Sequence, residues 1–283
     1  MEENVVVISG GRVVGDVYGG DADADGSATG NRVEVTGGEL LGFVNGGGVS
    51  GVGIARNNRV TVSGGKIGMG VAGGFAHFVG GARRETAGKG ETNREKKTNS
   101  AMENSVRISG DVEIEGHVSG GFVLDSEGSA TGNSVEISGG TIRGNVYGGR
   151  AFRGDACDNT VVISGGAIKA RDDVVYAGYV HEPKSGRATG NTITLSGSPD
   201  LATITLHGNN RPTWQTDGNT LNFKGFRGTI RGFSHFQEVN VDKDSVVTVT
   251  GDGPHEILIV NNEGQIVFEK PVSNPGAFMR GKR

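Results

Sequence analysis

The sequence predicts an all-β chain folded as a right-handed parallel β-helix, or β-solenoid, of about seven to eight coils with an irregular C-terminal cap. Three observations lead to this prediction: a unit of roughly 26 to 32 residues recurs, apolar and polar residues alternate within it, and its corners are rich in glycine. A repeat of this length built from short strands is typical of a β-solenoid. Parallel pairing between coils favours a right-handed helix because crossovers between parallel strands are right-handed.

Residues 133–149 give the repeat in its clearest form, NSVEISGGTIRGNVYGG. Val135 and Ile137 alternate with Ser134 and Glu136, so one face of a strand is apolar and the other is polar. A serine and two glycines follow, and such residues favour a tight corner because glycine adopts positive φ and the hydroxyl bonds nearby backbone. We therefore expect the apolar columns to fill a narrow core.

An asparagine opens each unit, and six of the seven intervals between these asparagines span 26 to 32 residues. Stacked amides can each bond the amide above and below, which predicts a structural ladder inside the corner. The residue before the asparagine is mostly Gly, Asn or Asp, the types that tolerate a left-handed backbone, and Glu103 is the exception. The predicted ladder consists of Asn4, Asn31, Asn58, Asn104, Asn133, Asn159, Asn191 and Asn219.

Composition excludes several classes of protein. The 283 residues include 53 glycines and only 34% hydrophobic residues, which fits a thin rod with periodic corners. A net charge of −4 argues against nucleic acid as a partner. The single cysteine excludes an internal disulfide framework, and we interpret Cys157 as a small corner residue. No apolar run approaches the roughly 20 residues of a transmembrane helix.

The chain divides into three predicted regions. Residues 1–225 are expected to form the repeats, with a charged loop inserted at 75–103, followed by capping strands at 226–270 and a tail at 271–283. The inserted loop mixes both signs of charge and cannot bury itself, so it is either a binding loop or a solvated one. The sequence Asn-Asn-Glu-Gly at 261–264 indicates a hairpin between the last two strands. The chain starts within a coil and shows no signal-peptide pattern, which suggests a piece of a longer protein or a short protein with a covered edge.

Alternating carboxylates mark the only candidate metal site in the sequence. Asp21, Asp23 and Asp25 precede a glycine, as at the start of a calcium-binding loop. The glutamate expected at the twelfth position is absent, because Arg32 stands there. The alternatives are therefore a weak Ca²⁺ site and a solvated acidic loop, and no other cofactor is expected.

Three tyrosines share one position of the repeat, Tyr18, Tyr147 and Tyr176. Smaller residues occupy that position between them, so the sequence predicts no continuous aromatic column: Asn45, Ala72 and Ser119. Packing against neighbours is favoured over a sugar-binding platform.

The motifs T-G-N-x-V-x-I-S-G-G and G-N-V-Y-G-G, with F-S-H-F-Q-E-V-N-V at 233–241, resemble the passenger regions of bacterial autotransporters and related repeat-rich surface proteins. The resemblance covers about residues 4 to 250. It implies a β-helical rod that is extracellular or on the bacterial cell surface. Such rods are often adhesive, with a host surface, glycan or protein as partner.

The function expected from these observations is that of a non-catalytic, surface-exposed or secreted module for adhesion or partner binding. The alternatives are a polysaccharide-acting β-helix enzyme, lyase or glycosidase, and an effector or fibre module. Polysaccharide chemistry requires carboxylates, or carboxylates and basic groups, that converge on one face. The acidic clusters at 21–25 and 172–173 lie in different coils, and the six histidines share no position, so no enzymatic activity is expected.

Overall fold

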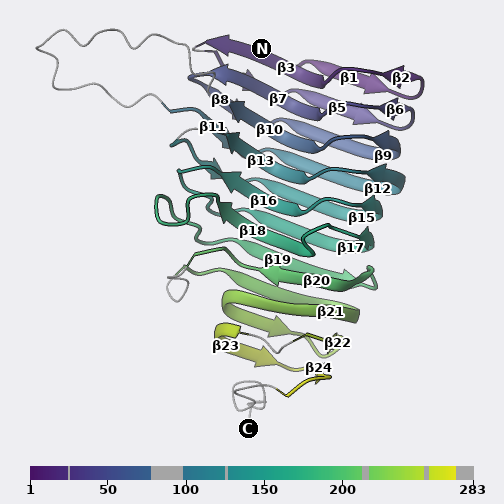
Figure 1. Cartoon of the computed structure of the whole chain (residues 1–283), viewed down its shortest axis with the longest axis vertical. Coiled ribbons are helices and arrows are strands. Elements are labelled where there is room, and N and C mark those ends of the chain that lie inside the picture. The colour runs from purple at the N-terminus through teal and green to yellow at the C-terminus, as the bar shows by residue number, and fades with distance from the viewer. Residues whose placement is uncertain (25, 78–97, 125–126, 212–216, 252–254, 272–283) are drawn as a thin grey trace, which may run out of the picture.

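The computed structural model describes residues 1–24, 26–77, 98–124, 127–211, 217–251 and 255–271. These residues contain strands and no helix, which confirms the all-β prediction. Strands of successive repeats lie side by side along the long axis, with β1 near one end and β24 near the other (Figure 1). Twenty strands form one sheet whose neighbours are parallel, and four short strands form another.

The strands fall into three rows, and members of a row pair with each other one repeat apart. The first row follows the asparagines: β1 (Val5–Ile8), β5 (Arg32–Val35), β9 (Arg59–Ile67), β12 (Ser105–Ile114), β15 (Ser134–Ile142), β17 (Thr160–Ile168), β19 (Thr192–Gly197) and β21 (Thr220–Val241), with the short β2 (Arg12–Val13) and β6 (Glu39–Leu40) paired beside it.

The second row comprises β3 (Val17–Ala24), β7 (Val44–Gly51), β10 (Val71–His77), β13 (Val118–Leu124), β16 (Val146–Ala151), β18 (Val174–Val180) and β20 (Leu201–His207). The third row is short: β4 (Ala28–Thr29), β8 (Ile54–Arg56), β11 (Ser100–Met102) and β14 (Ala130–Thr131). The chain ends with β22 (Val246–Val249), β23 (His255–Asn262) and β24 (Gln265–Phe268).

Each row of strands contributes a single layer of inward-facing side chains to the core. Val135 pairs with Val161 and Ile137 with Ile163 in register, and all four side chains are fully buried. The residues that alternate with them on β15, such as Glu136, are partly exposed, so the predicted alternation is confirmed. Register is fixed because a slip by one residue would turn every apolar side chain outward.

A ladder of asparagine amides runs through the stack beside this core. Asn133 illustrates it: its Oδ1 accepts bonds from the backbone and side-chain amides of Asn104, each 3.0 Å long, and its Nδ2 donates to Ala101 O and Asn159 Oδ1, both at 3.0 Å. The same side-chain bond joins each of the other neighbours, with lengths of 2.8 to 3.0 Å, through Asn4, Asn31, Asn58, Asn104, Asn159, Asn191 and Asn219.

The corner before each asparagine has a left-handed backbone, including the residue that the sequence left as an exception. Glu103 has φ of 57°, close to the 68° of Gly132 in the next repeat. A non-glycine residue adopts this conformation only where the surroundings fix it. Here the ladder holds the following asparagine, and the Glu103 carboxylate forms two bonds to Arg56 of the preceding repeat, at 2.8 and 3.0 Å.

The ends of the predicted insertion at 75–103 belong to the stack. β10 continues through His77, with Phe75 in register with Phe122, and Ala101 of β11 pairs with Ala130. Residues 78–97 lie outside the described residues. The boundary was placed too early because Phe75 breaks the repeat motif without breaking the strand.

The C-terminal strands continue the parallel stack. β21 runs across positions 225 and 226, where the sequence placed the start of a cap, and the predicted hairpin at 261–264 is wrong. β23 pairs in parallel with β21, and β24 pairs in parallel with β22, because the open edge of the preceding repeat offers a row of unpaired backbone groups. The predicted tail lies outside the described residues apart from residue 271. No helix in the described ranges has the length and apolar character to cross a membrane.

Candidate functional site

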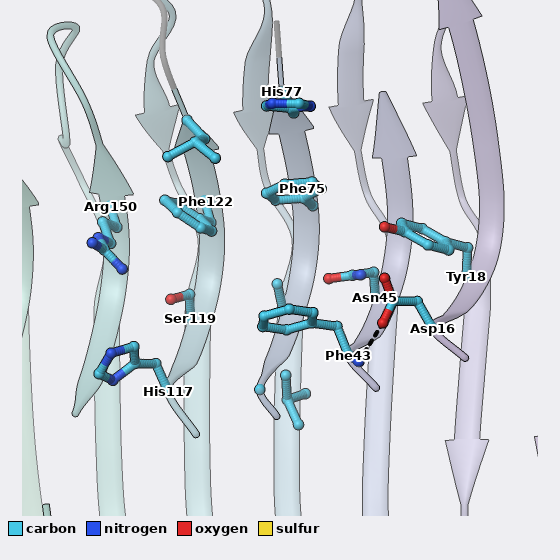
Figure 2. A pocket seen from close by; sticks show the side chains of 14 residues that line it. Asp16, Tyr18, Phe43, Asn45, Phe75, His77, His117, Ser119, Phe122 and Arg150 are labelled. Carbon is cyan, nitrogen blue, oxygen red and sulfur yellow. Dashed lines mark hydrogen bonds between the residues drawn. The ribbon is translucent and has the colours of Figure 1, made fainter. Parts of the chain in front are cut away.

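A groove with a volume of about 400 Å³ lies on the outer face of the second row, over β3, β7, β10, β13 and β16 (Figure 2). Its lining includes the rings of Tyr18, Phe43, Phe75 and Phe122. Acidic and amide side chains lie at the β3 end in Figure 2, and Arg150 with His117 lies at the other end.

The groove arises from two outward columns of the second row. The first is the broken tyrosine column, which pairs in the order Tyr18, Asn45, Ala72, Ser119 and Tyr147. The second follows the glycine pair, in the order Asp21, Gly48, Phe75, Phe122 and Arg150. Small residues in the middle of the first column leave a hollow between the large side chains at its ends.

The glycine pair between the two columns is required by the ladder. A Cβ at Gly121 would lie 2.5 Å from Cγ and Nδ2 of Asn133, and the equivalent position in every second-row strand from β3 to β16 is also a glycine. The backbone of the groove floor therefore lies directly against the amides, so the floor is held rigidly.

Carboxylates and a phenol form the β3 end. The Asp16 carboxylate accepts a bond of 2.8 Å from the backbone N–H of Phe43. A Cβ at Gly48 would lie 2.7 Å from both Asp21 Oδ1 and the Tyr18 ring, so these two side chains lie together over that glycine. Burial and then the charges of Asp16 and Asp21 raise the pKa of Tyr18, which keeps its hydroxyl protonated and able to donate.

Asp21 lies next to this end, beside Tyr18. Burial, followed by repulsion from Asp23, raises the pKa of its carboxyl above the ordinary value. Among the described residues, no Lys, Arg or His forms an ion pair with Asp16, Asp21 or Asp23. The β3 end is thus a concentration of negative charge without a cationic partner among the described residues.

A stacked guanidinium forms the opposite end. The Arg150 guanidinium carbon lies 4.7 Å from the ring centre of Phe122, 5.2 Å from that of Tyr147 and 5.8 Å from that of Tyr179. Stacking on rings orients a guanidinium while leaving its N–H groups available at the edge of the plane. Within the described ranges Arg150 has no carboxylate partner, so these donors can bind a ligand.

His117 is neutral beside this arginine. Its Nδ1 accepts a bond of 3.0 Å from the backbone N–H of Asn145, so its ring proton is on Nε2. Burial, and then the Arg150 charge, lower the pKa of His117. The cationic charge of this end therefore comes from Arg150, and His117 contributes a donor.

Asn145 is a buried residue next to His117. Its side chain is 3% exposed, and its Nδ2 donates to Tyr147 Oη at 3.1 Å and to Asp172 Oδ2 at 2.9 Å. Its Oδ1 has no hydrogen-bond partner among the described residues. An unpaired buried acceptor costs about 1 to 3 kcal/mol. This oxygen is enclosed, and Asn145 is not among the residues that line the groove.

The groove can therefore hold an elongated ligand with opposite charges at its two ends. Four strand spacings of about 4.8 Å separate β3 from β16, which places the acidic and basic ends about 19 Å apart. General acid–base catalysis across one bond requires its two groups to be much closer than that. Asp16 and Asp21, in contrast, lie at the same end, so they are the pair on which a catalytic hypothesis would depend.

Asp21, Asp23 and Asp25 are the three carboxylates that the sequence predicts as a Ca²⁺ site. Asp21 and Asp23 are both exposed on β3, and Asp21 lies beside Tyr18, which lines the groove. Asp25 lies outside the described residues. No group of three or more His, Cys, Asp or Glu side chains with metal-binding geometry occurs in the part of the chain that is described.

A second cluster on the same face was missed by the sequence. Ser234 Oγ lies 2.8 Å from His207 Nδ1 and 2.9 Å from His235 Nδ1, and His235 has a left-handed backbone with φ of 60°. Pairing of β20 with β21 places His207 opposite Ser234. The spacing of the histidines in the sequence does not show this cluster, because its register follows the strands and not the asparagine positions.

No protein-family model matches this chain, and searches of curated proteins and of solved structures give no match either.

Proposed function

We propose that this chain is a non-catalytic, surface-exposed or secreted binding module similar to an autotransporter passenger. In this proposal the strand stack is a right-handed β-solenoid of about seven to eight coils, and it acts as a rigid rod outside the cell. The groove over β3 to β16 is its binding site for a host or other partner. Adhesion is the biological role that such a rod would serve.

The groove is the single observation that carries this proposal. Its rings and its charged ends lie on a floor held by the asparagine ladder. A rigid floor reduces the entropy lost on binding, because the site is already formed. Concave sites with apolar walls and a few polar groups are the usual form of ligand pockets.

A variant that fills the groove tests the proposal. Ala72→Tyr places a tyrosine where β3 and β16 already carry one in the same column, so we expect the strand to accept it. Val162→Tyr is the matched control, because Val162 is outward on β17 and lies on another row. Wild type and both variants are applied to a glycan array and to an array of short peptides, after melting curves confirm folding.

We expect wild type and Val162→Tyr to bind the same ligands, and Ala72→Tyr to lose them. Absence of any ligand on both arrays, or binding that Ala72→Tyr leaves unchanged, would contradict the proposal.

The second candidate is a polysaccharide-acting enzyme, lyase or glycosidase. It is favoured by one observation: Asp16 and Asp21 lie at one end of the groove beside Tyr18, and the pKa of Asp21 is raised. Two carboxyls close together at one end of a groove, one of them with a raised pKa, resemble the acid and partner of a glycosidase. Turnover of any polysaccharide in a substrate panel, lost in Asp21→Asn with folding retained, would establish this function in place of simple binding.

A further inference from the structure

We propose that the groove binds an extended peptide segment of about six residues, with a cationic group at its β3 end, apolar side chains in its middle and a carboxylate at Arg150. This inference rests on the proposed function, since it names the partner of the same groove. It follows from three properties of the groove: its charge at each end, its apolar middle and its length.

The acidic end calls for a cation on the ligand. Asp21 lies over Gly48 beside Tyr18, and its carboxyl has no cationic partner in the described part of the chain. Asp16 and Asp23 add negative charge nearby. A lysine or arginine side chain, or an amino terminus, would neutralise this end and gain charge-assisted hydrogen bonds.

The middle of the groove calls for apolar side chains. Phe43 covers Gly70, because a Cβ there would lie 3.3 Å from the phenylalanine ring. Phe75 and Phe122 stand beside it with ring centres 5.4 Å apart. Figure 2 shows these three rings in the middle of the groove, between the two charged ends. Apolar side chains that enter between such rings are removed from water and stabilise the complex.

The basic end calls for a carboxylate. The three rings around Arg150 fix the plane of its guanidinium, whose paired N–H groups match the two oxygens of a carboxylate. His117 offers a neutral Nε2–H nearby. A carboxylate on the ligand would pair with the Arg150 guanidinium and accept a bond from this N–H.

The length sets the number of residues. The groove ends are about 19 Å apart, and an extended chain advances about 3.3 Å per residue, so about six residues connect the cation to the carboxylate. A polyanionic glycan would be repelled by the three aspartates, and a neutral glycan would leave Arg150 and Asp21 uncompensated. Charge complementarity at both ends therefore favours a peptide with one charge of each sign.

The test uses six-residue peptides with blocked termini, four central residues of alternating leucine and threonine, and the two terminal positions occupied by Lys and Glu, Lys and Lys, or Glu and Glu. Both orders of the Lys and Glu peptide are included, since the groove fixes the charges and not the chain direction. Binding is measured by fluorescence anisotropy at low salt, because charge pairing weakens with ionic strength.

For wild type, we expect one order of the Lys and Glu peptide to bind at least about tenfold more tightly than the Lys and Lys or Glu and Glu peptides. Arg150→Glu should switch the preference to Lys and Lys, and Asp21→Lys should switch it to Glu and Glu. Arg150→Gln and Asp21→Asn each remove a charge with little change of shape. Each variant should no longer distinguish Lys from Glu at the peptide position near the substituted residue, and should still distinguish them at the other end. These neutral variants also separate loss of charge from loss of folding.

Wild type that binds all peptides equally, or variants that do not switch preference, would overturn this inference. If the groove binds a glycan and Ala72→Tyr abolishes that binding while no peptide binds, the inference fails and the proposed function stands. If neither glycans nor peptides bind, both fail.

Discussion

Two halves of the same outer face differ only in what fills them. Over β3 to β13, the first outward column contains Asn45, Ala72 and Ser119, and a groove remains above them. From β16 to β20, the same column continues as Tyr147, Tyr176 and His207. The ring centres there are 5.9 and 4.8 Å apart, and both pairs are stacked.

The comparison separates the scaffold from the site. Both halves have the same parallel pairing and the same asparagine ladder, with a glycine beside the amide in each strand from β3 to β18. A continuous ring stack covers one half and stabilises it, whereas the other half lacks rings in the middle of the column. The outer face is therefore covered where the side chains of the column pack on each other. It is open where small side chains leave room for a ligand.

The largest expected loss of stability comes from replacing an asparagine of the ladder, which both halves share. Asn58 lies beneath Gly47 in the open half, and Asn159 lies beneath Gly149 in the filled half. Each accepts two hydrogen bonds and donates two, so replacement by alanine leaves several buried groups unpaired. We expect Asn58→Ala and Asn159→Ala each to lower the free energy of unfolding by about 4 kcal/mol.

Urea denaturation followed by circular dichroism measures both losses. Thr160→Ala, an outward change next to Asn159, is the control and should cost less than about 0.5 kcal/mol. A difference of more than about 1.5 kcal/mol between the two asparagine variants would show that the halves differ in their scaffold as well as in their outer columns.

The second prediction contrasts a ring in each half. Tyr176 stacks on Tyr147 and His207 and lies edge-on to Tyr179 at 5.0 Å, so Tyr176→Ala should lower the free energy of unfolding by about 3 kcal/mol. Phe43 is 42% exposed over the groove, so Phe43→Ala should cost less than about 1 kcal/mol and should weaken ligand binding instead. Equal losses of stability from the two variants would remove the distinction between a filled half and an open one.

The apolar columns and the asparagine ladder could be predicted from the sequence because both are periodic. The apolar pair such as Val135 and Ile137, and the asparagine before it, recur at nearly constant spacing, and stacking identical residues follows from that spacing alone. The hairpin expected at 261–264 failed because a local turn pattern was outweighed by the open parallel edge of β21.

The groove could not be predicted from the sequence because it depends on differences between repeats. The broken tyrosine column was recognised, but its break was interpreted as the absence of a platform and not as a hollow. Alignment of the residue after the glycine pair would have placed Phe75, Phe122 and Arg150 in one column with Asp21. The stacking of Arg150 on rings and the unpaired Asn145 oxygen require coordinates, since no spacing predicts them.

The third prediction uses pH to address the filled half. Burial, and then the nearby His235, lower the pKa of His207 to about 4 from its ordinary value of 6.5. Because the folded pKa is the lower one, the unfolded chain binds more protons between about pH 6.5 and pH 4. Stability is therefore complete above pH 6.5 and falls as the pH drops through that window, by about 3 kcal/mol at most.

His207→Tyr should abolish this part of the pH dependence, because a tyrosine continues the column above Tyr176 without titrating in that range. The measurement is the urea midpoint of both proteins at pH 6.5 and pH 4.5, where other groups titrate alike in the two. An identical fall in wild type and variant would assign the acid sensitivity to other residues, such as His235.

The smallest expected effect extends the filled half into the open one. Ser119 pairs with Tyr147 across β13 and β16, so Ser119→Tyr places a new ring at the end of the existing stack. A stacked ring pair adds about 0.5 to 1 kcal/mol to stability, and the new ring also occupies groove volume. Ser134→Tyr is the control, since its neighbours in register, Ser105 and Thr160, carry no ring.

A higher urea midpoint for Ser119→Tyr alone, together with weaker binding, would mean that stability and an open groove compete for the same column. A midpoint raised equally by both variants would instead reflect the strand preference of tyrosine, and the open half would then be free of that competition.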